Sequence, residues 1–272
     1  MVPEVVRRGA SLFAPPLIKI ARSIRRAVTS DSVVVEFVVR ALPDIRAREL
    51  QLRLLRRIAR DPGVKGLLIR IEAAPGGWAA TQDLRGSLSE FTERGKGLYA
   101  VLETPGNGAT WLASACDRVF MSPMGEMSLL GVGAELTFFG AALERIGVRP
   151  DFEAAGAYKS FGESYTRSFA STANQEAISS LIHSLNEQLI EGVAEGRGMS
   201  VQAVHNAMAQ APLSAPDALA LGLVDELAYE DEVHAWLDEA IGDHKRVGFD
   251  KWIKAEQIMQ QLDLATRSGK GI

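Results

Sequence analysis

Valine-rich apolar runs that alternate with amphipathic segments constrain the fold of this chain most strongly. The run from Ser32 to Leu42 (SVVVEFVVRAL) is typical of a buried strand, and residues 64–72 and 98–103 predict two more strands. A helical segment and short connections separate each strand from the next. This alternation is the pattern of an α/β domain with a mostly parallel sheet. From Thr172 onward the sequence is helical, so we also expect a helical C-terminal region.

The segments between these strands have the periodicity of amphipathic helices. The apolar residues expected to face the sheet are Leu50, Leu54, Leu55 and Ile58 in residues 46–60, and Leu84, Leu88 and Phe91 in residues 79–94. Further helices are predicted over residues 107–115, 138–146, 172–195, 217–221 and 231–241, with another after Met199-Ser200 and an amphipathic tail to about Leu264. Short strands are predicted over residues 118–121 and 150–155.

The composition is that of an ordinary globular protein. The chain has 272 residues, 47% of them apolar and 24% charged, which excludes disordered, collagen-like and disulfide-stabilised classes. Cys116 is the single cysteine, so no internal disulfide can form, and we expect it to be a buried thiol. We predict an N-terminal arm over residues 1–30, one domain over residues 31–241 and a C-terminal extension over residues 242–272.

The net charge of −4 gives no case for nucleic-acid binding, but the charge is unevenly distributed. Residues 1–29 contain six basic side chains and one acidic side chain, a balance of +5. After Pro15-Pro16 their apolar and basic residues separate onto two helical faces. This indicates docking on an anionic membrane surface or a partner, or else a solvated arm packed on its own domain. No apolar run reaches eighteen residues and no secretory signal is visible, so we expect a cytoplasmic protein or one peripheral at the inner membrane.

Two glycine-containing turns follow predicted strands, at the edge where open α/β sheets bind ligands. At Gly76 and Gly77, bare N–H groups can stabilise a developing oxyanion, although Pro-Gly-Gly is also an ordinary tight turn. Asn107 begins a helix, where the helix dipole favours a nucleophile. Because an amide does not attack a carbonyl as a serine does, its simplest role is an N-cap. The nearest hydroxyls, on Thr110 and Ser114, are expected to lie away from the exposed start of that helix.

Lys159, in AGAYKSFGE, is the candidate general base. A lysine amine acts as a base only when it is neutral, which requires a dry surrounding, and Phe152 and Phe161 are apolar neighbours in the sequence. Serine–lysine pairs are an alternative to triads that contain histidine. The alternative role is that of a surface lysine at a strand end. The four histidines have no metal-ligand spacing, so we expect no metal.

Five motifs occur in an order and spacing that resembles the signal peptide peptidase A (protease IV) family. They are DPGVKGLLIRIEAAPGGWAATQDLRGSL, GKGLYAVLE, GNGATWLASACDRVFMSP, RIGVRPDFEAAGAYKSFGES and ALALGLVDEL. The resemblance runs from about Ser32 to about Glu239. It implies a ClpP/crotonase-like α/β fold, rings or domes of repeated domains, and a Ser/Lys dyad that needs no cofactor. It also implies an endopeptidase that degrades signal peptides left in membranes.

By this resemblance, Lys159 matches the general base, and Gly76 and Gly77 match the turn that helps to form the oxyanion hole. The nucleophile position falls on Asn107, and Ala74 replaces the serine of the family's SPGG pattern. These departures resemble the N-terminal half of the long two-domain members. In those, the first half supplies the lysine and the second supplies the serine, and this chain stops about where a second half would begin.

Three interpretations follow. The first is a lysine-donating half of a Ser/Lys endopeptidase that acts on apolar peptides. It would assemble as a homo- or hetero-oligomer with a serine-bearing homologous domain, in a separate chain or a missing second half. The second is a catalytically inactive binding or assembly homologue of the same fold. The third is a crotonase-type acyl-CoA enzyme, which needs acidic catalytic residues, and for which Glu103 is the only close candidate.

Overall fold

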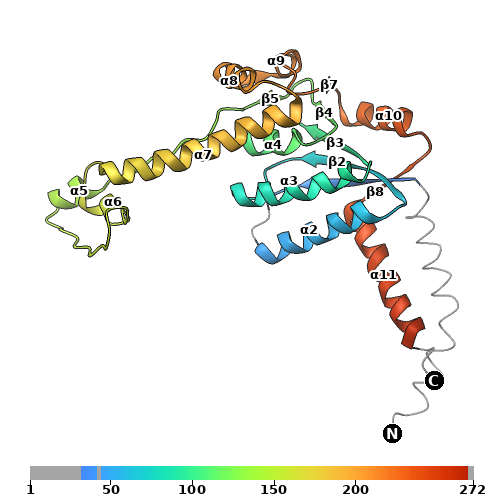
Figure 1. Ribbon diagram of the computed structural model, residues 1–272, viewed down its shortest axis with the longest axis horizontal. Coiled ribbons are helices and arrows are strands. Elements are labelled where there is room, and N and C mark those ends of the chain that lie inside the picture. Colours follow the sequence, from blue (N-terminus) through green and yellow to red (C-terminus); the bar gives the residue numbers. More distant parts are fainter. Residues whose placement is uncertain (1–31, 42–43, 269–272) are drawn as a thin grey trace, which may run out of the picture.

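A parallel sheet forms the centre of the molecule in the computed structural model, which describes residues 32–41 and 44–268, with side chains as far as Ile258 (Figure 1). Its six strands have the order β7-β4-β3-β2-β1-β8, and every neighbouring pair is parallel. The strands are β1 (Val33–Val39), β2 (Val64–Ile71), β3 (Gly97–Leu102), β4 (Arg118–Met121), β7 (Glu226–Leu227) and β8 (Lys245–Gly248). This is the α/β architecture that the alternation predicts. Two further short strands, β5 (Glu126–Met127) and β6 (Leu213–Ser214), pair antiparallel.

Helices cover both faces of the sheet. The helices are α2 (Ile45–Arg60), α3 (Trp78–Glu93), α4 (Asn107–Ala113), α5 (Gly140–Arg145), α6 (Glu163–Thr166), α7 (Thr172–Arg197), α8 (Val201–Gln210), α9 (Ala215–Ala220), α10 (Glu230–Ile241) and α11 (Phe249–Ser268). Val33, Val35 and Phe37 of β1 face the larger core, which α2, α3, α4 and α7 complete. Val34 faces the opposite side, where α10 packs its Val233 and other apolar residues. β1 therefore has few polar positions because both of its faces are covered.

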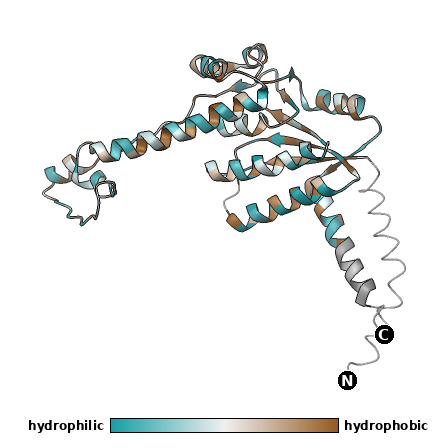
Figure 2. Cartoon of the chain, viewed as in Figure 1, coloured by the Kyte–Doolittle hydropathy of each residue, from teal (hydrophilic) through white to brown (hydrophobic). Residues whose placement is uncertain are grey.

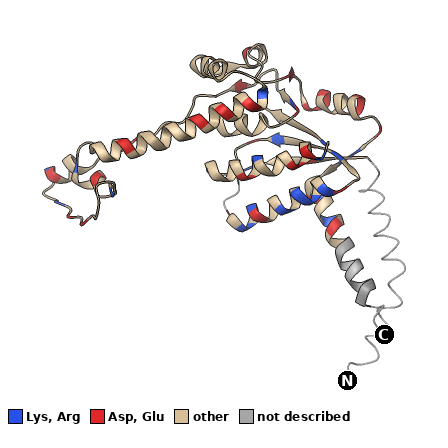
Figure 3. Ribbon diagram, in the orientation of Figure 1, with Lys and Arg blue, Asp and Glu red and all other residues tan. Residues whose placement is uncertain are grey.

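The helical stripes pack largely as predicted. Leu84, Leu88 and Phe91 of α3 are at most 1% exposed. In α2, Leu55 and Ile58 are fully buried, but the expectation for Leu50 is wrong, because its side chain is 52% exposed. Leu50 lies on the solvent side of the helix, whose exposed face is otherwise rich in arginine, as the blue bands of Figure 3 show.

The C-terminal segment packs on the same domain. β8 pairs with β1 in parallel over Val33 to Glu36, and Trp252 of α11 is 2% exposed. Residues from the predicted extension therefore complete the sheet and part of its core. The predicted N-terminal arm, residues 1–30, lies outside the described residues.

One part of the chain projects from the sheet. This projecting part, residues 133–187, is called the arm below and is distinct from the predicted N-terminal arm. It runs out along an extended segment, turns through α5 and α6, and returns along α7 (Figure 1). Its end, residues 138–171, is called the arm tip below. The predicted strand over residues 150–155 is wrong, since no strand forms there. A strand needs a neighbouring strand to pair with, and this segment lies beyond the edge of the sheet.

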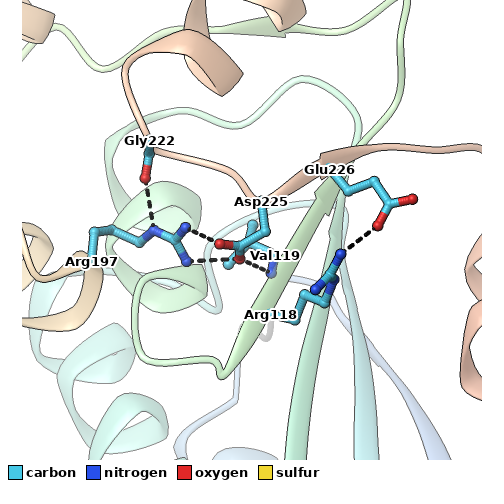
Figure 4. A network of polar contacts seen from close by, with 6 residues as sticks. All are labelled: Arg118, Val119, Arg197, Gly222, Asp225 and Glu226. Atoms are coloured by element: carbon cyan, nitrogen blue, oxygen red, sulfur yellow. Dashed lines mark hydrogen bonds and ion pairs between the residues drawn. The ribbon is translucent and has the colours of Figure 1, made fainter. Parts of the chain in front are cut away.

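A polar network fixes the other end of α7 to the sheet (Figure 4). Arg197 donates to both carboxylate oxygens of Asp225, at 3.0 and 2.6 Å, and to the carbonyl oxygen of Gly222 at 3.1 Å. Asp225 also accepts a 2.7 Å hydrogen bond from the backbone N–H of Val119 in β4. The C-terminal end of α7 is therefore attached to the β4–β7 edge through charged side chains.

Candidate active site

The turns after β2 and β3 lie side by side at the C-terminal edge of the sheet. Ile71 and Leu102, the last residues of these strands, are paired in register. Beyond them, a Cβ atom added to Gly108 would lie 2.9 Å from the Cβ of Ala74, so the two turns are in contact. The sheet thus brings the Gly76-Gly77 turn close to the start of α4, where Asn107 lies.

The Gly76-Gly77 turn presents free backbone donors. Both glycines are exposed, and Gly76 has φ of 140°, a conformation that other residues rarely adopt. Gly77 is the N-cap of α3 and contributes no side-chain cap. Neither N–H group donates to an acceptor among the described residues. Such a pair can stabilise an oxyanion, each donor contributing about 3 kcal/mol to a transition state.

Asn107 has a different role from the one that the sequence predicts. Gly106 is the N-cap of α4, and Asn107 is its first helical residue, so the predicted N-cap is wrong. Its side-chain Oδ1 accepts hydrogen bonds from the N–H groups of Leu130 (2.9 Å) and Gly131 (3.1 Å), and its Nδ2 donates to the Gly131 carbonyl (2.6 Å). The carboxamide therefore binds the backbone of a segment more than twenty residues away.

The other candidate nucleophiles near this edge are buried. Thr110 and Ser114 are 3% and 2% exposed, as predicted for residues away from the helix start. The Ser114 hydroxyl is hydrogen-bonded to Trp111 and Gly192 carbonyls. Cys116 is 4% exposed, and burial raises the pKa of its thiol far above the ordinary value, which makes it a core residue.

Lys159 lies far from the two turns within the same chain. It is an exposed residue of the arm tip, and its side chain makes no hydrogen bond or ion pair with any residue that the structure describes. Trp78, which follows Gly77, donates a hydrogen bond to Gln188 of α7, whereas the arm tip joins the N-terminal end of α7 at Thr172. At 1.5 Å per residue, that length of helix spans about 24 Å. Hence one chain does not bring Lys159 together with Gly76, Gly77 and Asn107.

The arm tip is nevertheless an ordered unit held by its own hydrogen bonds. Phe139 N–H donates to the Ser164 carbonyl at 2.6 Å, which joins α5 to α6. The Glu163 carboxylate accepts from Ser171 N–H and the Asn174 side chain, at 2.9 and 3.0 Å. These hydrogen bonds hold the pKa of Glu163 below its ordinary value. Next to Lys159, the Tyr158 hydroxyl donates to Glu176 of α7 at 3.0 Å.

Two polar contacts of α7 were not predicted from the sequence. Asn186 of α7 binds the backbone of Val132, and Arg85 of α3 donates to carbonyls of Trp111 (2.6 Å) and Gly192 (2.9 Å). No local signal distinguishes Asn186, because the uncharged stretch between Glu176 and Glu187 contains several other polar residues. Among the described residues, no group of three or more His, Cys, Asp or Glu side chains is arranged to bind a metal.

The mostly parallel six-stranded sheet with flanking helices is that of a ClpP-like α/β domain. The profile of peptidase family S49 matches residues 90–243, more than half of the chain, so the chain belongs to this family. Within the part of the chain that the structure describes, no helix is long and apolar enough to cross a membrane.

Several relatives carry protease names. The chain is 27% identical over 189 residues to "Serine protease SPPA, chloroplastic" of Arabidopsis thaliana, covering 70% of this chain and 28% of that protein. It is 25% identical over 140 residues to "Protease 4" of Haemophilus influenzae, covering 51% of this chain and 23% of that protein. It is 22% identical over 179 residues to "Putative signal peptide peptidase SppA" of Enterococcus faecium, covering 65% and 52%. The chain thus spans about a quarter of the first two relatives.

Proposed function

We propose that this chain is the lysine-donating domain of a Ser/Lys-dyad endopeptidase of the signal peptide peptidase type. Lys159 would act as general base for a serine that a homologous domain supplies, either in a second chain or in another part of a longer protein. We also propose that the backbone N–H groups of Gly76 and Gly77, at the C-terminal edge of this chain's own sheet, are oxyanion-hole donors. The substrates would be apolar peptides that resemble signal peptides.

The separation of Lys159 from position 107 is the observation that carries this proposal. The lysine lies at the arm tip, about 24 Å along α7 from the level of the two turns. Position 107 holds an asparagine whose carboxamide is already hydrogen-bonded to Leu130 and Gly131. A base on an extended arm serves a reacting hydroxyl only if another domain brings that hydroxyl to it.

The surface of the arm supports a partner at this place. Six aromatic side chains of the tip are between 38% and 76% exposed: Phe139, Phe152, Tyr158, Phe161, Tyr165 and Phe169. α7 has no charged residue between Glu176 and Glu187, and Figure 2 shows apolar residues along its projecting part. Exposed apolar patches of this kind mark interaction sites. Covering the tip would also surround Lys159 with apolar groups, which favours the neutral amine that a general base requires.

A reconstitution experiment tests the proposal. The chain alone is expected to cleave no peptide and to show no labelling by a fluorophosphonate probe. Mixing it with a serine-bearing S49 domain from the same organism should create cleavage of an apolar signal-peptide substrate. Lys159→Ala and Lys159→Arg should each lower kcat by at least about 100-fold, since the arginine is never a base at neutral pH.

Lys65→Ala is the matched control, because Lys65 is an exposed lysine of β2, distant from the arm. Lys159→Cys treated with bromoethylamine should regain activity, since this restores an amine at almost the same place. The buried Cys116 thiol is expected to remain unreacted. Full activity of Lys159→Ala in the mixture would show that Lys159 is not the base.

A second candidate is a catalytically inactive binding or assembly homologue of the same fold. The engaged carboxamide of Asn107 favours it, because this chain's own edge then lacks a nucleophile. In that case the mixture would bind peptides or the partner domain, and Lys159→Ala would change neither binding nor cleavage.

Contact with a membrane is proposed for residues 1–29, which lie outside the described residues. Their balance of +5 favours anionic lipid headgroups. Sedimentation of the chain with vesicles containing anionic lipid, but not with neutral vesicles, would support an inner-membrane location. Equal recovery with both kinds of vesicle would contradict it.

A further inference from the structure

Two asparagine side chains hold consecutive residues of one extended segment at the root of the arm. Asn107 of α4 binds the N–H groups of Leu130 and Gly131 and the carbonyl of Gly131. Asn186 of α7 accepts from the Val132 N–H at 2.8 Å and donates to the Val132 carbonyl at 2.8 Å. Each carboxamide thus takes the place that a peptide group of a neighbouring strand would occupy.

These contacts satisfy all of the main-chain polar groups of Gly131 and Val132. No strand forms over residues 130–132, so no backbone ladder supplies these bonds. Both residues are partly buried, and a half-buried backbone donor or acceptor that loses its partner is unfavourable. The position of the segment therefore depends on the two side chains.

The backbone conformation and the close surroundings of Gly131 both favour glycine at this position. Its φ is 86°, and an added Cβ would lie 2.9 Å from Asn186 Oδ1 and 2.8 Å from Met208 Cε. A side chain at position 131 would therefore push against Asn186 as well as strain the backbone.

The asparagine pair lies where the arm leaves the body. On the body side of Asn186, Leu189 and Ile190 of α7 are buried against the core. On the other side, most α7 residues as far as Gln175 are exposed or half-buried. Asn186 joins the outgoing segment to α7, and Asn107 joins the same segment to α4. These five hydrogen bonds therefore tie both the outgoing segment and α7 to α4 at the candidate site.

We infer that Asn107 and Asn186 are positioning residues that fix the direction of the arm, and with it the place where Lys159 is presented. About 20 Å of α7 lies between Asn186 and the tip, so a tilt of roughly 10° at the pair would move the tip by about 4 Å. A displacement of about 1 Å can reduce a rate 100-fold when catalytic groups must meet. The link to Lys159 rests on the proposed function, whereas the direction of the arm is a property of this chain alone.

Distance measurements between spin labels test the inference. One label is placed on the arm tip (Ala157→Cys) and one on α3 (Gln82→Cys), both at exposed positions, in a Cys116→Ala background. The unaltered pair should give a narrow distance distribution. Asn107→Ala and Asn186→Ala should each broaden or shift it, and hydrogen exchange of peptides spanning residues 128–135 should become about tenfold faster.

Asn206→Ala is the matched control. Asn206 is an exposed asparagine of α8 whose side chain accepts a hydrogen bond from Gln202 and does not touch the arm. If either alanine variant fails to fold by circular dichroism, Asn107→Asp replaces it. The aspartate keeps the two accepted bonds but places a second carboxylate oxygen where Nδ2 donates to the Gly131 carbonyl, so the repulsion between the two oxygens should also shift the distribution.

The inference is overturned if the distributions of the Asn107 and Asn186 variants match that of Asn206→Ala. This experiment uses no partner domain and no substrate. A failure here is therefore distinguishable from a failure of the Lys159 experiment, which measures cleavage. If both succeed, Asn107→Ala and Asn107→Asp should each lower kcat in the reconstituted mixture, whereas Asn206→Ala should not.

Discussion

At the scale of a residue, the Asp225 carboxylate shows how hydrogen bonds to one side chain contribute to the stability of the fold. Burial by itself raises the pKa of Asp225, but hydrogen bonds from Arg197 and from Val119 N–H outweigh that effect and lower it below the ordinary value. The neighbouring Arg118–Glu226 pair has a 2.6 Å hydrogen bond as well, yet both of its side chains are more than one-third exposed. The two pairs differ in burial, since the Arg197 side chain is only 8% exposed.

We predict that Asp225→Asn lowers the free energy of unfolding at pH 7 by about 2 kcal/mol, and that Glu226→Gln lowers it by less than about 0.5 kcal/mol. A lowered folded-state pKa stabilises the protein above the ordinary aspartate pKa of about 3.9, and the gain is lost as the pH falls through the folded value. In urea unfolding from pH 7 to pH 3, the free energy of unfolding of the wild type should therefore approach that of Asp225→Asn as the pH falls. A constant difference across that range would contradict the assignment.

At the scale of an element, α3 contains one glycine and α7 contains two, and the surroundings of these glycines differ. Gly86 in α3 has open space where a Cβ would lie. In α7, a Cβ on Gly196 would lie 2.0 Å from the Ser114 carbonyl oxygen, and one on Gly192 would lie 2.1 Å from Trp111 Nε1. The C-terminal part of α7 therefore approaches α4 closely because it lacks side chains at these two positions.

Substituting alanine at the two helical glycines should change stability in opposite directions. Gly86→Ala should stabilise the protein by about 0.5–1 kcal/mol, because alanine favours the helix. Gly196→Ala gains the same propensity but displaces α7 from α4, so a net loss of about 1–3 kcal/mol is expected. Thermal and urea unfolding of both variants measure this. Equal effects of the two substitutions would mean that the close approach does not constrain α7.

At the scale of the whole molecule, the arm gives the domain an asymmetric shape. The sheet and its helices form the body, while the arm extends well beyond it (Figure 1). The arm tip has exposed aromatic residues but few contacts with the body. The candidate lysine and the candidate oxyanion turn therefore lie far apart within one chain.

Phe161→Ser together with Phe169→Ser should weaken association with the serine-bearing domain by more than tenfold, since exposed aromatic residues commonly dominate interfaces. The free energy of unfolding should change by less than about 0.5 kcal/mol, because these side chains are 76% and 68% exposed. Sedimentation velocity measures the association. Met124→Ser, at an 84% exposed position of the body, is the control and should leave association unchanged. Unaltered association of the double variant would locate the interface elsewhere.

Local sequence patterns predicted the body of this molecule well. The β1, β2, β3 and β4 runs and the helices between them were visible because burial of each element leaves a repeating pattern along its own sequence. The prediction for residues 150–155 was wrong because a strand needs a neighbouring strand, and no strand among the described residues pairs with this segment.

The geometry of the candidate site was less predictable. The turn at Gly76 and Gly77 follows from the strand before it, but the bonds of Asn107 come from Leu130 and Gly131, which no local pattern connects with position 107. The length of α7 was predicted almost correctly, since the sequence is helical from Thr172 to about Glu195. The direction of α7 away from the body depends on its packing against α4, which the sequence does not show. The location of Lys159 could therefore not be predicted.

Strand β1 has neighbours that are synthesised at very different times. β2 follows it closely, whereas β8, on its other side, is translated about 200 residues later, which takes roughly 10–40 s at typical ribosome rates. During that interval the valine-rich edge has unpaired amides that other nascent chains can bind. We therefore expect the emerging polypeptide to depend on a holding chaperone until β8 has left the ribosome.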